Sequence, residues 1–177
     1  ICAVDLSGNG VLDLVVNGSL IPNRNQAGWP FDPGETLDLG LGRCACFLDV
    51  SGDGRKDALF LRGGGCEQQL MWARRASDYT FDEALPVDLP VETITQVSVV
   101  EDGGRAALLV QHNMYQNISM FELSEAHDDA PVFRKAGRAE SVSAVLQCSD
   151  QAWPCVCDWD GDGIDDLVIG GGYGWPR

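Results

Sequence analysis

The sequence predicts an all-β fold built from repeated four-stranded antiparallel sheets. A loop rich in aspartate and glycine recurs along the chain, short apolar stretches flank each copy, and no stretch shows a helical period. With 177 residues and 45% hydrophobic content, the chain is long enough to bury a core.

The recurring loop occupies residues 5–13, 49–57 and 158–166. Its copies read Asp-Leu-Ser-Gly-Asn-Gly-Val-Leu-Asp, Asp-Val-Ser-Gly-Asp-Gly-Arg-Lys-Asp and Asp-Trp-Asp-Gly-Asp-Gly-Ile-Asp-Asp. The apolar stretches that follow, at residues 14–16, 58–61 and 167–169, suit strands and are too short for helices. We therefore expect each loop to join two strands.

The spacing of the loops predicts a further, degenerate repeat. Successive loops begin 44 and 109 residues apart, and the second interval is about twice a period of roughly 50 residues. Residues 99–110 keep the apolar strands and the glycine turn but lack the acidic series, so this copy is expected to hold no metal. The predicted repeats are 1–46, 47–97, 98–154 and a partial 155–177.

Further strands are expected at residues 67–75, 92–101, 106–112, 117–124 and 141–148, because Gly, Pro, Asn and Asp separate these β-prone stretches. About four strands in roughly 45 to 55 residues is typical of a β-propeller blade, which buries its faces against neighbouring blades. Both ends of the chain carry the beginning of a repeat. We therefore expect a partial propeller, three full repeats and part of a fourth, that belongs to a larger one.

The charge of the chain excludes several classes of partner. Asp and Glu number 27 against 12 Lys and Arg, a formal charge of −15, which opposes binding to nucleic acid or anionic lipid. The longest apolar run, residues 106–110, is far shorter than the roughly 20 residues that cross a bilayer. No membrane-spanning segment is expected.

The seven cysteines favour an oxidising compartment. Cys148 and Cys155 flank a short segment as the ends of a hairpin would, which makes a local disulfide between them plausible, while the remaining connectivity stays open. Zinc at Cys44-x-Cys46 and Cys155-x-Cys157 is a weaker alternative, because zinc sites usually separate two cysteines by two to four residues.

The loops carry the chemistry of a calcium site. Side chains at loop positions 1, 3, 5 and 9 all hold an oxygen, position 7 offers a backbone carbonyl, and calcium takes six to eight oxygen ligands. Glycine at positions 4 and 6 lets the chain turn around an ion. The sequence predicts up to three structural Ca²⁺ ions, with the ligands Asp5, Ser7, Asn9, Val11, Asp13; Asp49, Ser51, Asp53, Arg55, Asp57; and Asp158, Asp160, Asp162, Ile164, Asp166.

Two other kinds of loop share part of this pattern. An EF-hand needs a glutamate at position 12 and flanking helices, whereas position 12 is Val16, Phe60 or Ile169. Solvated Asx turns without metal are the alternative that remains, above all for the first loop with Asn9-Gly10.

Residues 158–167 match the pattern Asp-x-Asp-Gly-Asp-Gly-x-x-Asp-Leu and resemble the FG-GAP or VCBS repeats of β-propellers, including integrin α-subunit heads. The resemblance implies a propeller with structural loop calciums and ligand binding on blade-top loops or between blades. This chain departs from the pattern by having Ser7, Ser51 and Asn9 at ligand positions where the pattern has aspartate. It also lacks the acidic loop near Glu101, and its cysteines are unusual for the family. Three of these, Cys2, Cys46 and Cys155, hold equivalent strand positions.

No catalytic constellation is found. His112 and His127 are expected at the surface or at strand ends, and neither a Gly-x-Ser-x-Gly elbow nor a phosphate loop occurs. The sequence therefore predicts a noncatalytic extracellular module for adhesion, matrix or surface assembly, whose partner is another protein or the remaining propeller blades. Asn17 and Asn117 begin glycosylation triplets that suit this location.

Two alternatives stay open. A carbohydrate-binding propeller would stack sugar rings on tryptophans, although the same residues suit blade packing. The candidates are Trp29, Trp72, Trp153, Trp159 and Trp175. A noncatalytic appendage of a secreted polysaccharide-active enzyme is the other alternative.

Overall fold

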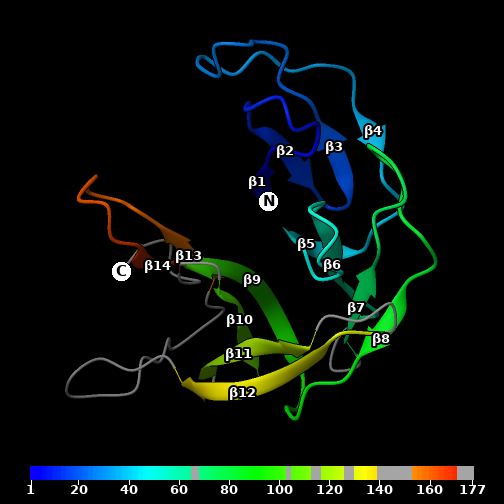
Figure 1. The fold of residues 1–177 in the computed structure, drawn as a ribbon, viewed down its shortest axis with the longest axis vertical. Helices are drawn as coiled ribbons and strands as arrows, with labels where there is room; N and C mark the ends of the chain where they lie inside the picture. The colour runs from blue at the N-terminus through cyan, green and yellow to red at the C-terminus, as the bar shows by residue number, and fades with distance from the viewer. Residues whose placement is uncertain (65–67, 103–104, 113–116, 126–129, 139–152, 171–177) are drawn as a thin grey trace. The chain divides into compact units, whose positions relative to one another are not determined.

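The computed structural model describes residues 1–64, 68–102, 105–112, 117–125, 130–138 and 153–170 (Figure 1). They form two compact units, the first mainly residues 1–62 and 70–87 and the second mainly the described residues between 88 and 170. Every regular element in these ranges is a β-strand. No helix there is long and apolar enough to cross a membrane.

The first unit contains two four-stranded antiparallel sheets, each a meander in chain order. The strands of the first sheet are β1 (Cys2–Val4), β2 (Asp13–Val16), β3 (Ser19–Ile21) and β4 (Leu37–Asp38). Those of the second are β5 (Arg43–Leu48), β6 (Asp57–Arg62), β7 (Gln69–Ala73) and β8 (Leu85–Val87). The first strands of the two sheets, β1 and β5, contact each other.

The second unit repeats this plan. Strands β9 (Ile94–Asp102), β10 (Arg105–His112), β11 (Asn117–Glu125) and β12 (Val132–Arg138) form one antiparallel meander. Strands β13 (Trp153–Cys157) and β14 (Asp166–Gly170) form a hairpin, and β13 contacts β9. First strands of successive sheets are therefore neighbours in both units.

The predicted all-β class and the four-stranded antiparallel sheets are confirmed. Each of the three acidic loops joins two antiparallel strands, in one register: Val4 pairs with Asp13, Leu48 with Asp57, and Cys157 with Asp166. The strands predicted around residues 67–75, 92–101, 106–112 and 117–124 are present as β7, β9, β10 and β11. The strand predicted at residues 141–148 lies outside the described residues.

Apolar side chains hold the two sheets of the first unit together. Strand β6 is buried from residue 57 to 61, which requires cover on both of its faces because successive side chains point to opposite sides. The cluster comprises Val4, Leu6, Val15, Leu20, Leu39, Phe47, Ala58, Phe60, Met71 and Ala73. In the second unit a smaller cluster of Leu109, Ile118 and Ile169 joins the meander to the hairpin.

The cysteines correct one expectation. Cys155 and Cys157 carry free thiols, so the local disulfide expected at Cys155 is not formed; Cys148 lies outside the described residues. Cys2 packs against the core of the first unit and Cys46 is buried, which is the behaviour of a small apolar residue.

Candidate metal centre

All three loops fold around the aspartate at position 1. In the first loop Asp5 Oδ1 accepts the N–H groups of Gly8 at 2.7 Å and Asn9 at 3.2 Å, and Asp5 Oδ2 accepts that of Gly10 at 2.7 Å. Asp49 accepts the equivalent three bonds at 2.8, 3.2 and 2.9 Å. Asp158 does so at 2.7, 3.0 and 3.0 Å. One carboxylate thus organises each bend.

The glycines make this bend possible. Those at positions 4 and 6 have φ values of 74° and 82° in the first loop, 75° and 83° in the second, and 80° and 86° in the third. The side chain at position 5 then accepts the N–H of position 7, at 2.8 Å from Val11, 2.9 Å from Arg55 and 2.8 Å from Ile164. The same fold at three sites argues against three unrelated turns.

The aspartate at position 9 begins the second strand of its sheet and is capped by backbone N–H groups. Asp57 is fully buried; its Oδ2 accepts from Val50 at 3.2 Å and Ser51 at 2.9 Å, and its Oδ1 from the Arg75 N–H at 2.9 Å. Asp13 Oδ1 accepts from Asn23 at 2.8 Å. Asp166, which is exposed, accepts from Trp159 at 3.1 Å.

Asn23 and Arg75 were missed by the sequence analysis. Each lies two residues beyond the third strand of its sheet, forms an isolated bridge to Pro33 or Phe81, and donates its N–H to the position-9 carboxylate. Because the peptide N–H makes this hydrogen bond, no pattern of side chains in the sequence predicts it. The sequence shows only a polar residue shortly after an apolar stretch, and that Asn23 and Arg75 are buried is known from the structure.

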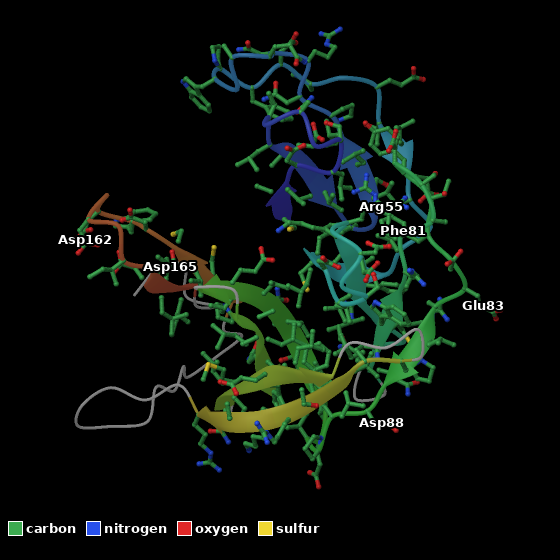
Figure 2. All side chains as sticks on the ribbon, in the orientation of Figure 1. Arg55, Phe81, Glu83, Asp88, Asp162 and Asp165 are labelled. Atoms are coloured by element: carbon green, nitrogen blue, oxygen red, sulfur yellow. The ribbon has the colours of Figure 1, made fainter. Side chains whose placement is uncertain are left out.

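The third loop brings three carboxylates together. Ligand atoms of Asp158, Asp160 and Asp166 lie within 4.8 Å of one another, and among the described residues this is the grouping that could hold a metal ion. Oxygens bound to one Ca²⁺ at about 2.3–2.6 Å lie at most about 5 Å apart, so the spacing fits. Figure 2 shows Asp162 and Asp165 at the bend between β13 and β14 that carries this cluster.

The second loop holds a buried polar atom that lacks a partner. Ser51, the predicted ligand at position 3, has a buried Oγ without a hydrogen bond. Such an atom is costly unless something binds it, and a cation would. In the first loop the equivalent Ser7 hydroxyl donates instead to Asp5 Oδ1 at 3.3 Å. The donor sets of the second and third loops therefore fit a hard cation better than that of the first.

Nearby groups tune the charge of the loops. Burial raises the pKa of Asp5, but the N–H groups of Gly10, Gly8 and Asn9 outweigh it, so the pKa falls below 3.8. The Arg55 N–H lowers the pKa of Asp53, and so does Arg74, whose Nη2 lies 3.4 Å from Asp53 Oδ2. Both carboxyl groups are ionised at neutral pH, as metal ligands must be.

His112 ends strand β10, which is one of the two places predicted for it. Its side chain is buried, and its Nε2 lies 2.8 Å from Ser119 Oγ. Burial, then the charges of Lys135 and Arg138, lower the pKa of His112 below 6.5, so it is neutral at pH 7. His127 lies outside the described residues.

The tryptophans divide between core and surface. Trp72 is buried in β7, whereas Trp29 and Trp159 are 82% and 75% exposed. Trp175 lies outside the described residues, as does the side chain of Trp153.

Comparison with known proteins adds no relative: no protein-family model, curated protein or solved structure matches this chain. The assignment of the loops rests on their motif and on the geometry above.

Proposed function

We propose that this chain is a noncatalytic, calcium-stabilised extracellular module of β-propeller blades that supports adhesion, matrix or surface assembly by binding another protein or further blades. The observation that supports it is the common fold of the three loops, with one carboxylate accepting three N–H groups and a second carboxylate at the start of the next strand. The resemblance to FG-GAP or VCBS repeats agrees with this proposal.

Calcium would offset the negative charge of the carboxylates at the bend that joins two strands. Carboxylates that share a site repel each other strongly unless a cation lies between them. Three Ca²⁺ ions carry six positive charges and would bring the formal charge from −15 to −9. The blades would then form a rigid support for the loops that contact a partner.

Calorimetry on chelator-stripped protein tests the metal assignment. Added Ca²⁺ should bind and raise the melting temperature, with about 2.7 kcal/mol of stabilisation per site at a hundredfold excess over Kd. Asp160→Asn should abolish binding at the third loop. Asp165→Asn removes one negative charge from position 8 of the same loop, which is not a predicted ligand, and should retain Ca²⁺ binding. If added Ca²⁺ gives no binding heat and no rise in melting temperature, the proposal is overturned.

A second candidate, carbohydrate binding, is favoured by the presentation of Trp29. Asn23 Nδ2 donates to Gly28 O at 2.9 Å, and Asn23 Oδ1 accepts from Asn25 and Asp32, each at 3.0 Å. Asn25 Nδ2 donates to Pro30 O at 2.7 Å. These bonds fix the segment that exposes the Trp29 indole, which suits stacking on a sugar ring.

A glycan array separates the two candidates. A sugar binder should give hits that Trp29→Ala removes and that Trp159→Ala, at the other exposed tryptophan, leaves unchanged. An array without hits, together with a purified protein partner that binds independently of Trp29, would exclude the carbohydrate function.

A further inference from the structure

The side chain of Arg75 is buried and fixed by backbone carbonyls. It is 7% exposed; Nε donates to Ser77 O at 3.0 Å and Nη2 to Asp78 O at 2.8 Å. Nη2 also donates to Leu6 O. Arg75 belongs to the second sheet of the first unit, while Leu6 follows the first strand of the first sheet. The guanidinium therefore links the two sheets.

Leu6 is position 2 of the first loop, between the predicted ligands Asp5 and Ser7. Its side chain is 1% exposed and belongs to the core between the sheets. Since the core holds the Leu6 side chain and Arg75 holds its carbonyl, the path of the chain between the two ligands depends on both contacts.

The main chain of Arg75 contacts the other loop. Its N–H donates to Oδ1 of Asp57, the predicted position-9 ligand of the second loop. One residue thus touches two loops, through its peptide N–H on one side and through its guanidinium on the other. The connection runs from Asp57 through Arg75 to Leu6.

The equivalent residue of the first sheet makes no such link. Asn23 caps Asp13 through its N–H, as Arg75 caps Asp57, but the side chain of Asn23 bonds within its own segment, to Gly28, Asn25 and Asp32. The shared position therefore has a common backbone role, and the long arginine side chain adds a contact to the neighbouring sheet.

We propose that Arg75 is a positioning residue that couples the first loop, residues 5–13, to the second loop, residues 49–57, so that Ca²⁺ in one raises the affinity of the other. This inference rests on the proposed calcium binding. An ion in the second loop fixes Asp57 and with it Arg75, so the Leu6 carbonyl is already ordered when the first loop binds. Binding that shares an ordering cost in this way is positively cooperative.

Calorimetric Ca²⁺ titrations of the full chain test the coupling. Asp160→Asn, present in every sample, removes the third loop from the titration, and Asp49→Asn silences the second. In protein with Arg75, silencing the second loop should lower first-loop affinity about fivefold, the lower end of typical couplings. In Arg75→Gln the first-loop affinity should be the same whether or not the second loop is silenced.

Arg24→Gln is the matched control, because Arg24 lies in the same unit and pairs with the exposed carboxylate of Asp32; it should keep the full coupling. Circular dichroism checks folding, and Arg75→Lys, which can reach a single carbonyl, replaces Arg75→Gln if the latter unfolds and should show reduced coupling. Unsubstituted protein that binds no Ca²⁺ would overturn the proposed function. Two sites that fill independently in the presence of Arg75 would overturn the coupling alone.

Discussion

Removing the Asp57 carboxylate should destabilise the first unit even without metal. Asp57 is fully buried and accepts N–H bonds from Val50, Ser51 and Arg75. Asp57→Ala leaves these three donors without an acceptor. The same change at Asp13, which accepts from Asn23 alone among the described contacts, leaves one.

The magnitude follows from this difference. A buried donor without an acceptor costs about 1–3 kcal/mol. Asp57→Ala, which leaves three, should therefore lower the free energy of unfolding by about 3–9 kcal/mol, and Asp13→Ala, which leaves one, by about 1–3 kcal/mol. Against a total stability of about 5–15 kcal/mol, the first loss is large enough to unfold part of the population.

Urea unfolding in EDTA, followed by far-UV circular dichroism, measures these losses with metal removed. Glu83→Ala controls for the change in charge, since Glu83 is exposed (Figure 2), and it should alter stability by less than about 0.5 kcal/mol. Equal losses for Asp57→Ala and Asp13→Ala in EDTA would refute the reasoning, because the capping bonds would then not determine stability.

Three other outcomes are expected. Gly42→Ala should lower the free energy of unfolding in urea by about 1–3 kcal/mol, because a Cβ there would lie 2.2 Å from Leu61 O. Gly64→Ala, where a Cβ would have nothing within 4 Å, should lower it little, and equal losses would contradict the close approach at Gly42. Because the pKa of His112 is lowered in the folded state, the unfolded state binds more protons below pH 6.5, so the free energy of unfolding should fall as pH drops from 6.5 toward the folded pKa. The free energy of unfolding of His112→Gln should fall less over this range, and parallel pH curves for the two proteins would contradict this. Arg74→Gln should raise second-loop Ca²⁺ affinity a few-fold, about 2- to 5-fold by calorimetry, since it removes a cation 3.4 Å from Asp53; lower affinity would show that Arg74 helps position the ligand.

Much of the fold was predictable because the loops are local. A carboxylate that accepts three N–H groups within five residues, with glycines at two fixed positions, needs no distant partner, so the bend between β1 and β2 recurs between β13 and β14. The strands next to these bends were predictable for the same reason. Their short apolar stretches had to alternate with turns.

The remaining parts of the site depend on contacts between distant residues. The link from Arg75 to Leu6 joins residues 69 positions apart, and the N–H of Arg75 reaches Asp57 across two strands. His112 lies at a strand end, as predicted, but its buried contact with Ser119 on the neighbouring strand could not be predicted from the sequence. Cys155 has a free thiol for a similar reason, since proximity in sequence does not establish disulfide geometry.

The capping of Asp13 and Asp57 by peptide groups has a consequence for how such repeats can diverge. Every amino acid except proline carries an N–H, so positions 23 and 75 retain the cap under almost any substitution that fits the space. Selection can then recruit each side chain for a separate purpose, such as an asparagine that shapes its own segment or an arginine that reaches the adjacent sheet. Proline is the replacement that this arrangement forbids.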